Sequence, residues 1–146
     1  MKISTKGRYG LRLMMTLAEH YGRGPVSADT IADEQAISGA YVRLLAAGLK
    51  TAGLLRAVRG PSGGYELAGA PSQITAYDVV VALEGPIAPA ACAPDPSSCP
   101  RSERCAAHEV WHEVEKAISD VLRKFTVQEL AQRQRELLSE ALSFCI

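Results

Sequence analysis

Serine or threonine residues between apolar residues recur along the chain, and they limit where its helices can begin. Ser27, Ser38 and Thr75 each follow an apolar residue and precede another by four positions, the pattern of an N-cap within a hydrophobic staple. Thr126 precedes Glu129 by three positions, which is the spacing of a capping box. These patterns predict helices over about 28–35, 39–52, 76–84 and 127–143.

Two further helices are indicated by apolar residues spaced at intervals of three and four. Over about 7–21, we expect one buried face made of Leu11, Met14, Met15 and Ala18. A longer helix is expected over about 104–124, where one stripe holds Ala107, Val110, Trp111, Val114, Ala117, Ile118, Val121 and Leu122. From the pattern alone, this stripe fits either a core helix of its own domain or a helix that packs against a second chain.

A β-hairpin is expected after the third helix. Two short β-prone runs, 54–59 and 65–68, flank a turn rich in glycine. The order of helix, short helix, tight turn, helix and hairpin is that of a winged helix-turn-helix. The predicted fold is therefore mainly α with a small β-hairpin wing, and a long helix follows in the second half of the chain.

The segment from Gly85 to Pro100 divides the chain in two. It holds five of the eight prolines and two of the four cysteines. Helices and strands do not continue through such a density of proline, so we expect a loop. The predicted organisation is a winged-helix domain over residues 1–84, a loop over 85–103, and a long helix with a C-terminal helix over 104–146.

The charge of the chain is balanced as a whole but not in its halves. Residues 1–69 hold nine Lys and Arg against five Asp and Glu, whereas residues 70–146 hold seven against eleven. A basic first half permits a DNA-binding face there. No apolar run has the roughly 20 residues of a membrane span, and no secretion signal is recognisable. We therefore expect a cytoplasmic protein without a membrane partner, whose cysteines are not paired as disulfides.

The predicted third helix would enter the major groove of double-stranded promoter DNA. Its groove side, with the N-cap, comprises Ser38, Gly39, Ala40, Tyr41, Arg43 and Leu44. At the wing, Arg59 can enter a narrow minor groove, and the turn that lets the backbone approach DNA holds Gly60, Pro61, Gly63 and Gly64. Additional phosphate contacts are expected from Lys2, Lys6, Arg8 and Arg12.

Four potential metal ligands lie close together in the sequence: Cys92, Cys99, Cys105 and His108. Thiolates, sometimes with histidine, ligate iron–sulfur clusters, and zinc also accepts three cysteines and one histidine. The spacing differs from that of common zinc fingers, in which cysteines come in close pairs, but it leaves the metal open. His112 is an alternative to His108 one helical turn later, and Cys145 is expected to be a bystander.

No motif typical of a catalytic centre is present. The chain lacks the H-E-x-x-H motif of zinc proteases, the G-x-S-x-G motif of serine hydrolases and a phosphate-binding loop. We therefore expect no enzymatic activity and assign no catalytic residue.

Several stretches resemble the family of bacterial winged-helix regulators typified by IscR and NsrR, and most of all its iron–sulfur regulators of the IscR type. The resemblance covers roughly residues 1–130 and is carried by 1–9, 24–27, 31–35, 53–65 and 105–108. Its most specific element is the wing segment from Arg59 to Tyr65. The resemblance implies a homodimer that binds promoter DNA and is joined through the long helix over 104–124.

The same resemblance implies a [2Fe-2S] cluster, because regulators of the IscR type carry three cysteines and then a histidine. Cys92, Cys99, Cys105 and His108 match this pattern, with one more residue between the first two cysteines. The related nitric-oxide sensors hold a [4Fe-4S] cluster and have an acidic residue near the N-terminus, where this chain has Arg8.

These observations predict a homodimeric transcription regulator, acting as a repressor, that senses iron–sulfur status or a redox or nitrosative signal through a [2Fe-2S] cluster. Order in the loop would set the orientation of the two wings and recognition helices. The alternatives are a thiol-based regulator without metal, a [4Fe-4S] regulator responsive to nitric oxide, and a zinc-dependent protein.

Overall fold

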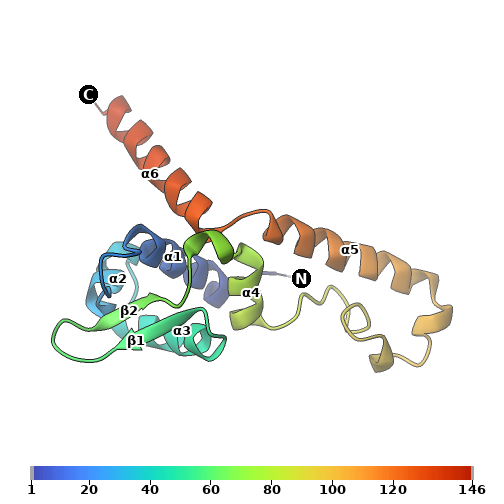
Figure 1. Ribbon diagram of the computed structural model, residues 1–146. Coiled ribbons are helices and arrows are strands. Elements are labelled where there is room, and N and C mark those ends of the chain that lie inside the picture. Colours follow the sequence, from blue (N-terminus) through green and yellow to red (C-terminus); the bar gives the residue numbers. More distant parts are fainter. Residues whose placement is uncertain (1, 146) are drawn as a thin grey trace.

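The structure, a computed structural model, describes residues 2–145, so the outermost positions of the predicted segments, residues 1 and 146, lie outside the described part. Within these residues the chain forms six α-helices and one antiparallel hairpin (Figure 1). In chain order they are α1 Thr5–Glu19, α2 Ala28–Gln35, α3 Gly39–Thr51, β1 Leu55–Val58, β2 Gly64–Leu67, α4 Ala76–Glu84, α5 Ala106–Arg123 and α6 Val127–Phe144. The predicted order of helices and hairpin is confirmed.

The predicted helix caps are confirmed as well. At each of four helix starts the cap hydroxyl accepts a backbone N–H of the first turn, and the caps are Ser27, Ser38, Thr75 and Thr126. Asp78 and Glu129 complete reciprocal capping boxes at the last two. Because a cap satisfies N–H groups that have no partner within the helix, local sequence alone fixes these starts.

The first helix differs from its prediction in position and in orientation. It begins two residues earlier, at Thr5, because the Ser4 hydroxyl caps it by accepting the N–H of Lys6, and it ends at Glu19. The expected buried face is wrong except for Met14, since Leu11, Met15 and Ala18 are only half-buried. The buried apolar side chains of α1 are Leu13, Met14 and Leu17. Apolar residues lie on several sides of this helix, so its periodicity could not single out one face.

The proline-rich segment is a loop, as predicted. Two 3-10 turns interrupt it, at Pro96–Ser98 and Ser102–Arg104. The second turn replaces the expected first residues of the long helix, so α5 starts at Ala106 instead of 104. The hydroxyl of Ser102 is directed back into the loop, where it donates to the carbonyl oxygen of Pro96 over 2.7 Å.

The hydrophobic core lies between α1, α2, α3, α4, the hairpin and the start of α6. Its least exposed large side chains are Leu13, Met14, Leu17, Ile31, Val42, Leu45, Leu49, Leu55, Val79 and Val127. The hairpin is held against this core by an additional backbone pairing, in which Val26 and Tyr65 exchange two hydrogen bonds of 2.8 Å. The wing is therefore anchored at its second strand to the segment that precedes α2.

Leu83 of α4 occupies a space that two glycines leave open. A Cβ atom at Gly10 of α1 would lie 2.0 Å from Leu83 Cδ1, and one at Gly48 of α3 would lie 2.9 Å from Leu83 Cδ2. Both methyl groups of the leucine thus pack against the backbone of a glycine, and a larger residue at either position would force the leucine side chain to shift. This contact fixes the position of α4 relative to α1 and α3.

Glu84, the last residue of α4, binds the start of α1. Its Oε1 atom accepts hydrogen bonds from the Ser4 N–H (2.8 Å), the Ser4 hydroxyl (2.5 Å) and the Gly7 N–H (3.0 Å). Partial burial raises the pKa of Glu84, but hydrogen bonds from Ser4 and Gly7 outweigh it, so the pKa is lowered overall. The carboxylate therefore stabilises the fold at neutral pH, and this contribution is lost as the pH falls through the lowered pKa.

The junction between α5 and α6 is bonded to the start of α4. The Ala76 N–H donates to the Phe125 carbonyl over 2.8 Å, and the Val127 N–H donates to the Ile74 carbonyl over 2.9 Å. From this junction α5 and α6 run in different directions (Figure 1). The first half of α6 packs against α1 and buries Val127 and Ala131, whereas α5 projects from the winged-helix body and the loop runs from the end of α4 to the start of α5. Among residues 2–145, no helix combines the length and the apolar character needed to span a membrane.

We expect Gly10→Ala to destabilise the protein by about 1–3 kcal/mol, because the new methyl group overlaps Leu83. This loss has the opposite sign to the gain of roughly 1 kcal/mol that alanine gives inside a helix. Urea denaturation measures the change, and the double variant Gly10→Ala/Leu83→Ala should recover part of it. Gly69→Ala, a site with no atom within 4 Å of the added carbon, is the matched control. A stabilised Gly10→Ala variant would contradict the packing described.

Candidate DNA interface and cysteine loop

The turn between α2 and α3 directs the predicted recognition helix. Ala36 has a left-handed backbone conformation (φ 53°, ψ 46°), and among the described residues it alone combines a side chain with a positive φ. A left-handed alanine costs about 1–2 kcal/mol, so surrounding contacts must hold it. One of them is the bond of 3.0 Å from the Ile37 N–H to the Ala32 carbonyl.

Helix α3 presents most of the surface expected for DNA contact. Val42 and Leu45 are fully buried, as predicted, and direct the opposite side of the helix outward. That outer side holds the exposed residues Ser38, Ala40, Arg43 and Leu44 and the half-buried Gly39. Leu44 is 51% exposed on this outer side. Such a residue suits contact with the methyl group of thymine in the major groove.

Tyr41 is half-buried and is held by α1 instead of projecting freely. Its ring meets that of Tyr9 edge to face, with centroids 6.1 Å apart and planes at 81°. The guanidinium of Arg12 lies over the other aromatic ring of the pair, 4.9 Å from the centroid of Tyr9. Aromatic pairs of this geometry favour one orientation, so Tyr9 positions the residue that we predicted to contact DNA.

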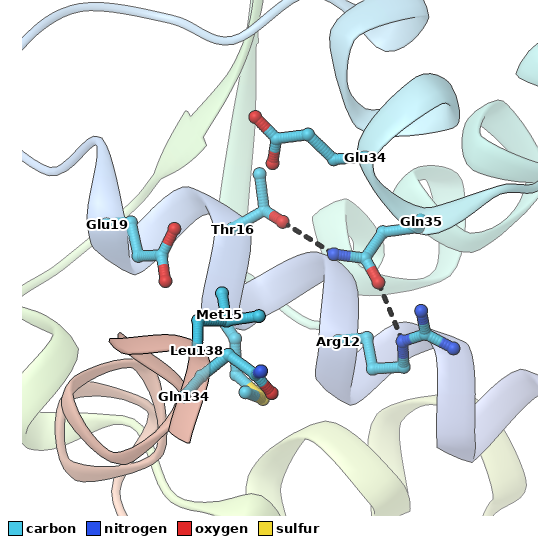
Figure 2. A pocket seen from close by; sticks show the side chains of 8 residues that line it. All are labelled: Arg12, Met15, Thr16, Glu19, Glu34, Gln35, Gln134 and Leu138. Carbon is cyan, nitrogen blue, oxygen red and sulfur yellow. Dashed lines mark hydrogen bonds between the residues drawn. The ribbon is translucent and has the colours of Figure 1, made fainter. Parts of the chain in front are cut away.

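Arg12, predicted as a phosphate contact, is engaged within the protein. Its Nε atom donates to Gln35 Oε1 over 2.7 Å, and Gln35 Nε2 donates to the Thr16 hydroxyl over 2.9 Å. Figure 2 shows this chain of bonds on one wall of a pocket between α1, α2 and α6, with Gln134 and Leu138 from α6 on the other side. The bonds fix α2 against α1.

The wing carries Arg59 and Pro61 at exposed positions of its turn. Gly60 has a positive φ of 108°. A Cβ atom at Gly63 would lie 2.2 Å from the Val58 carbonyl oxygen, and one at Gly64 would lie 2.1 Å from that of Val26. Gly63 and Gly64 therefore allow close backbone contacts within the protein, which shape the turn and hold the wing on the body. The approach of this turn to DNA stays a prediction.

Of the nine Lys and Arg in residues 1–69, only Arg56 forms an ion pair with a described residue. The eight unpaired cations include five of the predicted DNA contacts, Lys2, Lys6, Arg8, Arg43 and Arg59. All five are exposed. Arg56 of the wing differs, because its Nε atom lies 2.7 Å from the carboxylate of Glu66. Unpaired cations on α3, the wing and the start of α1 are available to phosphate groups.

The cysteines of the loop are free thiols in half-buried positions, Cys92, Cys99 and Cys105. Cys105 is the N-cap residue of α5, yet its side chain makes no capping bond. Because the thiol makes no capping bond, it is free to act as a metal ligand. Cys145 is exposed at the end of α6, away from the loop in Figure 1.

The structure does not gather the predicted ligands into one metal site. Within residues 2–145, no three side chains of His, Cys, Asp or Glu lie close enough to bind one ion. His108 nevertheless has a property expected of a metal ligand, because its Nδ1 atom is buried and has no hydrogen-bond partner. An unsatisfied buried nitrogen costs about 1–3 kcal/mol, which a bond to a metal would offset. The ring of His112 lies near, with centroids 6.3 Å apart.

Helix α5 has one apolar side that nothing in the described chain covers. Val110, Trp111, Val114 and Val121 are 53%, 41%, 37% and 51% exposed. The single buried residue of the helix is Ser119, which donates to Glu115 over 2.9 Å. At 100° per residue, His108 and Ser119 lie on a different side from the apolar stripe. The stripe predicted from the sequence is present, and it is not part of the core of its own domain.

Sequence reasoning missed three residues that position this surface: Tyr9, Gln35 and Glu84. Each acts through a contact between helices that are far apart in the sequence, so no local pattern marks it. The cap at Ser4 could have been found, since a serine two residues before Lys6 at the start of an apolar helix is a common N-cap signal.

Comparison with known proteins gives a consistent result. The chain matches the model of the Rrf2 family, described as iron-dependent transcriptional regulator, over residues 3–133. It is 42% identical over 131 residues to the HTH-type transcriptional regulator CymR of Bacillus subtilis, covering 90% of each chain. It is 35% identical over 138 residues to the regulator IscR of Erwinia tasmaniensis, covering 94% of this chain and 83% of that one.

Solved structures of such regulators share the fold. B. subtilis CymR, described as the global cysteine regulator, is similar with a TM-score of 0.74 at 40% identity, over 91% of this chain and 98% of that chain. T. potens IscR is similar with a TM-score of 0.75 at 37% identity, over 94% and 90% of the two chains. The winged-helix fold and the resemblance to IscR-type regulators, both predicted from the sequence, are confirmed.

The unpaired cations lead to a prediction for DNA binding. Arg59→Gln should weaken binding to duplexes selected by the protein from a random library by about 1–3 kcal/mol. If Arg59 contacts phosphate, the slope of log affinity against log salt should also fall by about 0.9. Arg56→Gln is the matched control, because Glu66 already neutralises that charge in the same hairpin. Equal effects of the two variants would contradict the assignment of Arg59 to the interface.

Proposed function

The chain belongs to the Rrf2 family of transcriptional regulators, so it regulates transcription through DNA and is not an enzyme; on this premise we propose that it works as a homodimer whose cysteine loop holds a [2Fe-2S] cluster. The ligands in this proposal are Cys92, Cys99, Cys105 and His108. Iron–sulfur status, or a redox or nitrosative signal acting on the cluster, changes the affinity of the protein for promoter DNA. The protein acts there as a repressor. The DNA contacts are those of α3 and the wing.

The buried, unpartnered Nδ1 atom of His108 carries the metal proposal. Three half-buried free thiols accompany it in the same segment of the chain. Thiolates are the usual ligands of iron–sulfur clusters, and histidine replaces some of them in known centres. The IscR relatives are similar in sequence to this chain over most of its length, and the description of the family names iron.

Binding of a cluster would give this loop an iron centre that gains or loses one electron. The role of the chain itself is to transmit a change in the shape of the loop to the winged-helix domain. The loop leaves α4 at Glu84 and returns at Cys105 to α5, whose far end is bonded to the start of α4 through Ala76 and Phe125. Because α4, the loop and α5 form a closed circuit, a change in loop shape has to be absorbed by the two helices.

The uncovered apolar side of α5 supports the homodimer. A stripe of this size on a soluble monomer is a mark of an interaction site. A second copy of the chain offers the same stripe, and such self-complementary contacts are typical of twofold dimers. Two recognition helices about one turn of DNA apart would then read paired half-sites.

A second candidate is a thiol-based regulator without metal. It is favoured by the absence of a gathered ligand set among the described residues and by the likeness to CymR, described as a regulator of cysteine. In this case, oxidation of the loop cysteines themselves would alter DNA binding.

Anaerobic purification tests the cluster. We expect visible absorption with iron and sulfide in equal amounts, and loss of both in Cys99→Ala, Cys105→Ala and His108→Ala, because each removes a ligand. Cys145→Ala is the matched control and should keep its iron. His112→Ala should also keep it, whereas loss of iron only in this histidine variant would move the fourth ligand to His112.

The same preparation separates the alternatives. Colourless protein with stoichiometric zinc would replace the cluster by a zinc site. Protein without any metal, whose DNA affinity changes on mild oxidation and no longer does so in Cys99→Ala, would establish the thiol-based candidate in its place. Absorption of the [4Fe-4S] type would keep the ligand proposal and change the centre.

The dimer is tested by a charge in the α5 stripe. Val114→Glu should convert the protein to monomers in analytical ultracentrifugation and weaken its binding to paired half-sites, because burial of a single charge in an apolar interface costs several kcal/mol. Lys116→Glu, on the opposite side of the same helix, is the control and should remain dimeric; it loses only an exposed pair with Asp120. A dimeric Val114→Glu variant would place the interface elsewhere.

A further inference from the structure

Glu84 joins two parts of the chain that the proposed function treats separately. It is the last residue of α4, and the cysteine loop begins at the next residue. Its carboxylate binds the N-terminal cap of α1, which lies at the opposite end of the DNA-binding domain in the sequence. The residues around this cap include Lys2, Lys6 and Arg8, three of the exposed cations that form no ion pair with any described residue.

The contact is specific for a carboxylate at this position. One oxygen accepts all three hydrogen bonds, two of them from backbone N–H groups at the start of the helix, which have no partner within it. Hydrogen bonds to a charged acceptor are about twice as strong as neutral ones, and the positive end of the helix dipole adds to them. A Cβ atom at Gly7 would lie 2.7 Å from Glu84 Oε1, so the glycine leaves room for the carboxylate.

The backbone after Glu84 ties this contact to the loop. Gly85 has φ 84° and ψ −168°, a conformation open almost only to glycine, and its N–H donates to the Val81 carbonyl to end α4. Leu83, on the other side of Glu84, is held between Gly10 and Gly48. A change in the path of the loop at Gly85 therefore reaches Glu84 before Leu83, whose methyl groups pack against two other helices.

We propose that Glu84 is a positioning residue that couples the cysteine loop to the basic start of α1, and thereby to DNA phosphates. With the carboxylate in place, residues 2–8 are ordered before DNA arrives, so binding costs less conformational entropy. When the loop draws Glu84 away, the first turn of α1 frays and its cations lose their fixed positions. The inference rests on the DNA-binding part of the proposed function, and it does not depend on which group the loop holds.

Full-length Glu84→Gln tests the contact, because it keeps an oxygen acceptor and the side-chain shape and removes only the charge. We expect faster amide hydrogen exchange at Ser4 and Gly7, the two N–H groups bonded to Glu84. Binding to a short random-sequence duplex should weaken about three- to tenfold, and the slope of log affinity against log salt should fall by about 1–2. Removal of a negative charge by itself would strengthen binding, so the sign of the change is diagnostic.

Glu19→Gln is the matched control, with the same charge change at the opposite end of α1. It should leave the exchange of Ser4 and Gly7 and the salt slope unchanged. Equal shifts in the two variants would reduce the effect to net charge and overturn the proposal. Unchanged exchange in Glu84→Gln would overturn the contact itself.

Gly85→Ala tests the coupling from the loop side without any metal. It adds a carbon in open space and strains only the backbone of the first loop residue. We expect the same rise in exchange at Ser4 and Gly7 as in Glu84→Gln, with no further rise in the double variant. Gly85→Ala with native exchange at these amides would show that the loop and the cap are independent. Binding of the wild-type protein to duplex DNA is measured before any variant is compared. Failure to bind would refute the DNA-binding role itself.

Discussion

The packing of the last turn of α4 against α1 is the contact on which the rest of the arrangement depends. Leu83 fills a space bounded by Gly10 and Gly48, and Glu84 caps the helix that contains the first of these glycines. One contact is apolar and depends on shape, the other is charged and depends on direction. Together they hold α1, α3 and α4 as one body, so that the recognition helix, the basic start of α1 and the exit of the loop keep fixed relative positions.

The surface that we propose for DNA contact is positioned mostly by residues that do not belong to it. Tyr9 orients Tyr41, the bonds from Arg12 to Gln35 and from Gln35 to Thr16 hold α2, and Val26 holds the wing through Tyr65. This division has a physical reason. Residues that contact DNA must be exposed and therefore add little to stability. Their orientation is instead stabilised by buried or half-buried neighbours.

The second half of the chain carries two features that the single chain leaves unsatisfied. The apolar side of α5 is uncovered, and the buried Nδ1 atom of His108 has no partner among the described residues. They lie on different sides of one helix, so a second copy of the chain and a metal centre could be accommodated together. Both unsatisfied features sit on the part of the chain that returns from the loop to the body, which is where a signal would have to pass.

The sequence by itself determined the helix starts at Ser27, Ser38, Thr75 and Thr126, the hairpin, the loop and the apolar stripe of α5, because caps, turns and periodicity act over a few residues. It also placed the candidate ligands within one short segment. Only the tertiary structure decided which face of α1 is buried, that Leu83 requires glycine at two other helices, and that Glu84 caps a helix far away in sequence. These contacts depend on the relative placement of elements separated by dozens of residues. Interactions between residues close in the sequence do not determine that placement.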